Sequence, residues 1–226
     1  MKTTLSIFIL ILSTTLMSQN SIQPTVDVSG EGIVRVVPDE VTINLRVENT
    51  GNDARELKRE NDRIVNEVLS FLKKEKIEEK YIKTEYIRLS KNYDYNSKSY
   101  NFSANQAISV KLSDLGRYES IMDGLLTSGI NRIDGISFSS SQRASLEAEA
   151  RKKAVAHAKM KAEEYAGVLD QKVGKAVSIR ENVSYSPPTP LYRGAMAMDA
   201  SAGGEQTMAP GEMEIRVMIY ISFELQ

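Results

Sequence analysis

The sequence predicts a mixed fold in which β-strands and α-helices share one chain, and three patterns point to it. At the end of the chain, apolar side chains alternate with polar or mixed ones from Glu212 to Leu225, the period of two that a half-buried strand shows. Alanine recurs at every fourth position from Ala150 to Ala166, which is a helical spacing. Two alternating runs, 82–95 and 100–112, are separated by a short polar turn, as in a β-hairpin. Strands and helices therefore alternate along the chain.

The amino terminus has the composition of a secretory signal peptide. Lys2 supplies a positive charge, and residues 5–17 are mostly apolar. This apolar run is shorter than the roughly 20 residues that a membrane-spanning helix needs. We expect residues 1–19 to be removed on export, with an approximate cleavage position, and the mature chain to contain no transmembrane helix.

Charge and cysteine content narrow the class of protein. Loss of Lys2 with the signal peptide leaves 28 basic residues (29 − 1) against 30 acidic ones, a formal net charge of −2. This balance argues against nucleic-acid binding, which requires a basic surface. The chain has no cysteine, so disulfides and thiol chemistry are excluded. About 200 mature residues suffice for one core or two closely packed lobes.

The first part of the mature chain predicts two strands and a helix. The run 26–37 contains Gly30 and Gly32, and a glycine within a strand often marks a bulge or the close approach of another backbone. The alternation at 41–48 indicates a second, half-buried strand. From about 52 to 76, apolar residues recur at three- and four-residue spacing, so we expect an amphipathic helix.

A hairpin, a helix and a strand follow. In the hairpin strand 82–95 the apolar phase slips after Tyr86, which a β-bulge would explain. A short helix is expected at 115–126, with Gly129 in its stop signal. Alternation at 130–139 predicts a further strand.

The longest predicted helix runs from about 141 to 169. Small side chains recur in it every four residues, at Ala150, Ala154, Ala158, Ala162 and Ala166. These alanines form a slanting ridge, because steps of four residues differ from a full turn by about 40°. The ridge allows a neighbouring element to approach closely. The basic run 151–153 is expected to be a solvated helix face, and 173–185 gives one more strand.

Residues 186–211 lack periodicity and are rich in proline, glycine and methionine, which predicts a long loop of the kind that is often functional. Met196, Met198 and Met208 are candidate contact residues, because methionine adapts to irregular surfaces; they are also oxidisable. A copper(I) site would need further converging ligands. The sequence supplies none, so we expect no metal and no cofactor.

Four segments in a fixed order resemble the SIMPL domain family. They are VSGEG at 28–32 with VVPD at 36–39, the alanine-rich stretch 147–166, the strand 174–179 and the ending 210–225. Each segment alone is a weak signal, whereas the ordered set is specific. The resemblance covers 26–225, so we expect one SIMPL domain over 24–226 that includes the loop 186–211 and follows the signal peptide at 1–19.

The resemblance implies an α+β fold with antiparallel sheets and with one long and two shorter helices packed on them. It implies an exported protein of the periplasm or outer envelope, similar to periplasmic immunogenic proteins and to proteins linked with oxidative-stress defence. Some members of the family assemble into large ring-like or channel-like homo-oligomers. The family has no established catalytic motif, so it supplies no catalytic residue.

The residues themselves do not indicate an enzyme. His157, the single histidine, lies within the long predicted helix, where a surface or sheet contact explains it better than a general base without a partnered nucleophile. One imidazole without a thiol falls short of a zinc site or a histidine triad. Asp39 and Glu40 would point to opposite faces of a strand, and a turn role is expected for Asp39 after Pro38. We therefore expect no catalytic, cofactor-binding or metal-binding residue.

Three uses fit the closing strand: sheet closure, the wall of a membrane barrel, or an edge between subunits. The predicted helices argue against a barrel, so an outer-membrane-associated barrel-like protein is the least favoured alternative. We favour a non-enzymatic homo-oligomer with a protective role such as oxidative-stress defence. The other alternative is a monomeric periplasmic adaptor that binds an envelope partner through 186–211.

Candidate interface residues come from the hairpin tip, the long loop and the second face of the closing strand. They are Tyr93, Tyr95 and Tyr100, then Met196, Met198 and Met208, and finally Arg216, Met218 and Tyr220. Tyrosine suits contact surfaces that are partly wet. Packing on a sheet face explains the tyrosines equally well.

Overall fold

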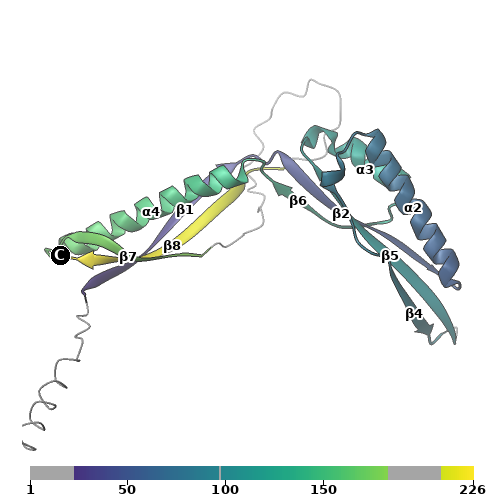
Figure 1. Ribbon diagram of the computed structural model, residues 1–226, viewed down its shortest axis with the longest axis horizontal. Coiled ribbons are helices and arrows are strands. Elements are labelled where there is room, and N and C mark those ends of the chain that lie inside the picture. Colours follow the sequence, from purple (N-terminus) through teal and green to yellow (C-terminus); the bar gives the residue numbers. More distant parts are fainter. Residues whose placement is uncertain (1–22, 97, 183–209) are drawn as a thin grey trace, which may run out of the picture. The chain divides into compact units, whose positions relative to one another are not determined.

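The computed structural model describes residues 23–96, 98–182 and 210–226, and it divides into two compact units (Figure 1). The first unit contains the described residues of Met1–Gly32, Arg151–Asn182 and Met218–Gln226. The second contains those of Ile33–Ala150 and Val183–Val217. Each unit is built around its own sheet, so the two are considered one at a time.

The helices and strands follow one another in the mixed order that the sequence predicts. They are β1 (Thr25–Val36), β2 (Glu40–Gly51), α2 (Ala54–Lys74), η2 (Glu79–Tyr81), β3 (Ile82–Thr84), β4 (Arg88–Asp94), β5 (Ser99–Leu112), η3 (Leu115–Arg117), α3 (Tyr118–Thr127), β6 (Arg132–Ser139), α4 (Arg143–Val168), β7 (Val173–Asn182) and β8 (Met213–Leu225). The chain passes from one unit to the other within β1, α4 and β8.

The second unit contains a five-stranded sheet in the order β3-β5-β2-β6, with β4 also paired to β5. The pairing is antiparallel, and β2 meets β5 from Val41 opposite Leu112 to Gly51 opposite Phe102. Helices α2 and α3 contribute with β2 and β5 to one apolar core, in which each fully buried aliphatic side chain contributes about 1.5–3 kcal/mol. The core contains Val41, Ile43, Leu45, Val47, Ile64, Val65, Val68, Leu72, Ile108, Val110, Leu112, Ile121, Met122, Leu125 and Ile130.

The phase slip predicted in 82–95 is a one-residue register shift. Thr84 lies opposite Ile108 and Arg88 opposite Asn105, so four steps along one side match three along the other. The side of the sheet that the even-numbered residues of β3 occupy is therefore occupied in β4 by the odd-numbered residues. A single extra residue on one strand is the defining feature of a β-bulge, so the prediction is confirmed.

Helix α2 begins and ends where local chemistry requires it. The Asp53 carboxylate accepts hydrogen bonds from two N–H groups of the first turn, at 2.7 and 3.0 Å, which satisfies donors that the helix leaves free. Beyond the last turn, Lys76 has a φ of 59°, the left-handed conformation that commonly ends a helix. The helix is therefore slightly shorter than the predicted 52–76.

A chain of polar contacts starts at a buried residue of the second unit and was not predicted. Asn61 is fully buried on α2, and its Nδ2 donates to Oε1 of Gln106 at 2.6 Å. Gln106 Nε2 in turn donates to the carbonyl oxygen of Glu85 at 2.7 Å. This chain links the helix to the segment between β3 and β4. Position 61 falls on the apolar spacing of α2, so periodicity alone does not reveal a polar contact there.

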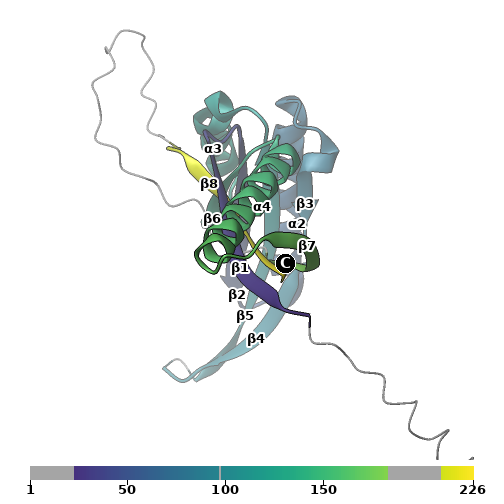
Figure 2. The same ribbon diagram turned by 90° about the vertical axis from the view of Figure 1, so that its left-hand side faces the viewer.

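The first unit contains a three-stranded sheet in the order β1-β8-β7, and helix α4 lies along one of its faces (Figures 1 and 2). From Met218 to Leu225, β8 pairs with β7 on one side, while β1 pairs along its other side. The closing strand is therefore the central strand of its sheet. Of the three uses that its alternation allows, sheet closure is the one that the structure shows.

The alanine ridge of α4 packs against the glycine of β1. Every alanine of the ridge is at most 1% exposed. A Cβ atom added to Gly30 would lie 2.0 Å from the carbonyl oxygen of Ala154 and 2.8 Å from the Cβ atom of Ala158. A strand and a helix can approach this closely only where the strand has no side chain. The close approach predicted from the sequence is confirmed.

The α+β class with antiparallel sheets is confirmed, and element boundaries shift by a few residues. The helix predicted at 115–126 is a 3-10 turn followed by α3. Asp114 caps the 3-10 turn by accepting a hydrogen bond from Gly116 N–H at 2.9 Å. The long helix spans Arg143–Val168 rather than 141–169. Helix ends are set by a few local hydrogen bonds, which periodicity does not locate.

Candidate functional site

The end of the β4–β5 hairpin carries a group of exposed side chains, here called the hairpin face: Leu89, Lys91, Tyr93, Tyr95 and Tyr100. Tyr93 lies opposite Tyr100, and the odd-numbered residues of β4 share that side of the sheet. No helix of the described residues buries this part of the sheet: Tyr93, Tyr95 and Tyr100 are 42%, 84% and 57% exposed. The structure therefore brings the three predicted tyrosines together on one surface.

The rings of the hairpin face are ordered by contacts with one another. The Tyr93 ring centroid lies 5.0 Å from those of Tyr95 and Tyr100, in edge-to-face geometry. The Lys91 ammonium lies 4.1 Å from the centroid of the Tyr100 ring, a distance at which cation–π attraction operates. Aromatic pairs of this kind contribute about 0.5–1.5 kcal/mol beyond their buried area. A preformed surface loses little conformational entropy when it binds a partner.

The opposite side of the same hairpin is polar. It carries Ser90 and Asn92 from β4 and Asn101 and Ser103 from β5, and Asn92 Nδ2 donates to the Ser103 hydroxyl at 3.0 Å. Within the described residues, β4 pairs with β5 alone, so its outer edge is open. An open edge strand is a template for pairing with another chain. The hairpin thus combines an apolar face, a polar face and a free edge.

The second face of the closing strand is partly exposed. Arg216 is exposed and lies 3.3 Å from the carboxylate of Glu214, while Met218 is half-buried. The Tyr220 hydroxyl donates to the Met218 sulfur at 3.3 Å, and the residue is 47% exposed. Met218 and Tyr220 therefore contact each other, and Arg216 belongs to a separate ion pair. The face that meets α4 carries the buried aliphatic residues of β8 instead.

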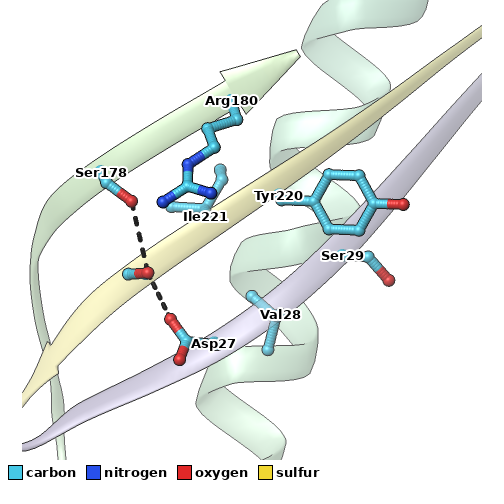
Figure 3. A pocket seen from close by; sticks show the side chains of 8 residues that line it. Asp27, Val28, Ser29, Ser178, Arg180, Tyr220 and Ile221 are labelled. Atoms are coloured by element: carbon cyan, nitrogen blue, oxygen red, sulfur yellow. Dashed lines mark hydrogen bonds between the residues drawn. The ribbon is translucent and has the colours of Figure 1, made fainter. Parts of the chain in front are cut away.

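A hollow of about 740 Å³ lies on this second face, within the first unit (Figure 3). Its lining consists of Asp27, Val28 and Ser29 from β1, Ser178 and Arg180 from β7, and Tyr220, Ile221 and Ser222 from β8. The Ser178 hydroxyl donates to that of Ser222 at 3.3 Å, and Ser222 donates to the Asp27 carboxylate. A row of polar groups thus crosses all three strands at one level of the sheet.

His157 contacts the backbone of β1. Its Nδ1 atom lies 3.2 Å from both the amide nitrogen and the carbonyl oxygen of Glu31. One helical turn further, the Lys161 ammonium donates to the carbonyl oxygen of Ser29 at 3.1 Å. Because β1 is an edge strand of its sheet, these side chains occupy backbone groups that the edge leaves available. The sheet contact expected for His157 is what the structure shows.

The adjacent carboxylates Asp39 and Glu40 have separate partners. Asp39 accepts hydrogen bonds from the hydroxyl and the N–H of Ser141, and these bonds hold its pKa below the usual value. Glu40 is buried, forms an ion pair with Lys111 at 2.8 Å and accepts a hydrogen bond from Ser139. Each of the two groups thus holds the chain in place around the start of β2 through its own partners.

Two further features bear on other classes of function. Among the described residues, no three His, Cys, Asp or Glu side chains gather as ligands of a metal ion would. No helix in the described part of the chain has both the length and the apolar character needed to cross a membrane. Met196, Met198 and Met208 lie outside the described residues, as does most of the predicted loop.

Of the residues that line the hollow, the sequence indicates Tyr220 and misses the others. The alternation of β8 places Tyr220 and Ser222 on one face, and Tyr220 is the residue of this pair that the sequence analysis indicates. Asp27, Ser178 and Arg180 come from two other strands, and no local pattern singles them out. Only the pairing of β7 and β1 with β8 brings these polar side chains to one place.

Comparison with known proteins gives consistent matches along the chain. The family model SIMPL, described as a protein of unknown function (DUF541), matches residues 26–223. The chain is 30% identical over 206 residues to the uncharacterized protein YggE of Escherichia coli (strain K12), covering 90% of this chain and 84% of that protein. It is 28% identical over 220 residues to the 26 kDa periplasmic immunogenic protein of Brucella melitensis biotype 1, covering 92% and 88% respectively.

Proposed function

The chain belongs to the SIMPL family, and on this premise we propose that it is an exported, non-enzymatic cell-envelope protein that assembles with copies of itself. The name of the Brucella relative describes that protein as periplasmic. The signal-peptide character of residues 1–19 supports the same location for this chain. The names of the YggE and Brucella relatives describe no enzymatic activity.

The hairpin face is the observation that carries the assembly proposal. Its tyrosines are exposed and held in fixed contact, whereas the opposite side of the hairpin is polar. Exposed aromatic residues that are ordered in advance are typical of protein interfaces. The open edge of β4 allows two hairpins to pair about a two-fold axis, where each copy uses the same patch.

The size of the surface is compatible with a specific contact. A stable interface buries about 800 Å² on each partner, and a single aromatic side chain can contribute about 150–250 Å². Three tyrosines with Leu89, which is 46% exposed, supply a large part of that area. Backbone hydrogen bonds along the edge of β4 would fix the register between copies.

The test is the mass of the mature protein in solution, measured by light scattering over a range of concentrations. The proposal expects a species well above the monomer. Substituting the cross-strand pair Tyr93→Ser with Tyr100→Ser removes two rings from the hairpin face and should shift the mass to that of the monomer. The matched control is Asn92→Ser with Asn101→Ser, the neighbouring cross-strand pair on the polar face, which should leave the assembly unchanged.

A strict monomer at every concentration would refute the assembly and would favour the adaptor alternative. In that case, deletion of 188–208 should abolish capture of an envelope partner while circular dichroism shows an intact fold. Equal loss of mass in the tyrosine and asparagine pairs would instead show that the hairpin face has no specific role. Thermal melts of all variants separate loss of assembly from loss of folding.

A protective role such as oxidative-stress defence is part of the proposal and rests on the family resemblance. It predicts that a strain lacking the protein is more sensitive to peroxide than the parent strain. Complementation with the Tyr93→Ser, Tyr100→Ser form tests whether protection requires assembly. Full rescue by this form would separate the two parts of the proposal.

A further inference from the structure

Arg180 presents a cation at the hollow of the first unit. The residue is exposed on β7, and no described residue forms a hydrogen bond or an ion pair with its guanidinium. Figure 3 shows the guanidinium turned toward the hollow, beside Ser178. A guanidinium offers several N–H donors in one plane and suits a carboxylate. This end of the hollow can therefore bind an anionic group.

Asp27 supplies the opposite charge from the other outer strand. One of its carboxylate oxygens accepts a hydrogen bond from Ser222, which is itself held by Ser178. The other oxygen accepts none from the described residues. The serine row thus orients the carboxylate and leaves one acceptor open, and an open carboxylate oxygen suits an ammonium group.

One strand, β8, lies between the strands that carry the two charges. Asp27 lies on β1 and Arg180 on β7, with β8 between them. Neighbouring strands lie about 4.8 Å apart, so the two outer backbones are about 10 Å apart. A ligand that reaches both groups needs its own charges several ångströms apart. An extended chain of two residues spans at most about 7 Å, which matches this separation better than a single amino acid does.

Other side chains of the hollow suit the middle of such a ligand. The Ser29 hydroxyl can donate to or accept from a peptide unit, whereas the Ser178 and Ser222 hydroxyls, whose protons go to Ser222 and Asp27, can only accept from one. The Tyr220 ring lies over the sheet between Arg180 and Ser29 (Figure 3) and offers an apolar surface. A purely anionic ligand would be repelled by Asp27, and a purely cationic one by Arg180. Arg180 and Asp27 together therefore complement a molecule that carries one negative and one positive group.

We propose that this hollow binds a short zwitterionic peptide, a dipeptide or tripeptide with free ends. Arg180 holds the terminal carboxylate and Asp27 the terminal ammonium. The test uses the mature full-length protein and L-alanyl-L-alanine as probe, with binding followed by calorimetry. Blocking either end, as the N-acetyl form or the C-terminal amide, should weaken binding by about tenfold or more. Glycine, whose charges are closer together, should also bind more weakly.

Substitutions in the protein test the contact of Arg180 with the peptide carboxylate and the contact of Asp27 with the peptide ammonium. Arg180→Gln should abolish discrimination between the free peptide and its amide, and Asp27→Asn should abolish discrimination against the N-acetyl form. Lys175→Gln is the matched control, because it removes a positive charge from the same strand at an exposed position that does not line the hollow. Its binding should equal that of the original protein.

Several results would overturn the inference. Absence of dipeptide binding up to about 20 mM, equal binding of the blocked peptides, or binding of inorganic phosphate as tight as that of the dipeptide each contradicts it. Because the blocked peptides test both ends without any substitution, a variant that fails to fold does not remove the test. The measurement is independent of assembly, since the Tyr93→Ser, Tyr100→Ser form should bind the dipeptide equally well.

Discussion

Gly30 shows how one residue sets the distance between two elements. The strand that contains it packs on the alanine ridge of α4, and the space for a side chain at this position is already filled by the backbone of Ala154 and the Cβ atom of Ala158. Larger residues on either side would force the helix away from the sheet. Separation of the two would expose the aliphatic residues of β8 that α4 covers, which costs hydrophobic free energy.

Substitution Gly30→Ala should therefore lower the free energy of unfolding by about 1–3 kcal/mol or more, because overpacking displaces a helix backbone. Gly135→Ala is the control, since an added Cβ atom there meets nothing within 4 Å; it should leave stability unchanged or raise it by up to about 1 kcal/mol. Urea unfolding measures both. Equal stability of the Gly30→Ala form and the original protein would show that α4 can shift without cost.

At the scale of elements, an ion pair joins α4 to the edge strand β7. Arg151 donates to the two carboxylate oxygens of Glu181, with both distances 2.8 Å. This contact departs from the expectation that the basic run 151–153 only solvates the helix. The hydrogen bonds from Arg151 lower the pKa of Glu181. As the pair is largely exposed, its contribution to stability is about 1 kcal/mol or less.

Replacing Arg151 by glutamine should raise the pKa of Glu181 toward its ordinary value, because the charge and one donor of the pair are lost. Nuclear magnetic resonance titration of the Glu181 carboxyl carbon measures the change. Lys159→Gln, which breaks the exposed pair with Glu163 on the same helix, should leave that pKa where it is. An unchanged Glu181 titration in the Arg151→Gln form would show that the ion pair does not persist in solution.

For the molecule as a whole, carboxylates with lowered pKa values make stability depend on pH. Three carboxylates have a pKa below the usual value because they accept hydrogen bonds. The donor to Asp39 is Ser141, the donor to Asp134 is Arg46, and the donor to Glu214 is Arg35. A group whose pKa is lower in the folded state binds fewer protons than the unfolded chain does. Its stabilisation is present above the unfolded pKa and is lost as pH falls through the folded value.

Stability should accordingly fall as pH drops below about 4, the ordinary range of these carboxyl groups. Urea midpoints measured at successive pH values check this expectation, since these groups remain ionised from pH 7 down to about 5 and lose their charge only below it. A midpoint that stays constant from pH 5 to pH 3 would contradict it. Raising the salt concentration should reduce the effect, because exposed charges are screened.

Most of the secondary structure could be predicted, and only part of the candidate site. The tyrosines of the hairpin face were found because they lie in two runs next to each other in sequence, where alternation fixes which side chains share a face. Asn61 was missed because its position fits the apolar spacing of α2. The hollow was missed because Asp27 and Arg180 are more than 150 residues apart (180 − 27) and are joined only by strand order.

By itself, the sequence determined which side chains of each strand face the same way, where glycine and alanine allow close packing, and where the hairpin contains an extra residue. These features follow from local covalent geometry, which repeats every two residues in a strand and every 3.6 in a helix. Tertiary structure alone decided that the closing strand lies at the centre of its sheet, between β1 and β7. Pairing between strands depends on the free energy of contacts between distant segments, so no local pattern specifies which polar groups will face one hollow.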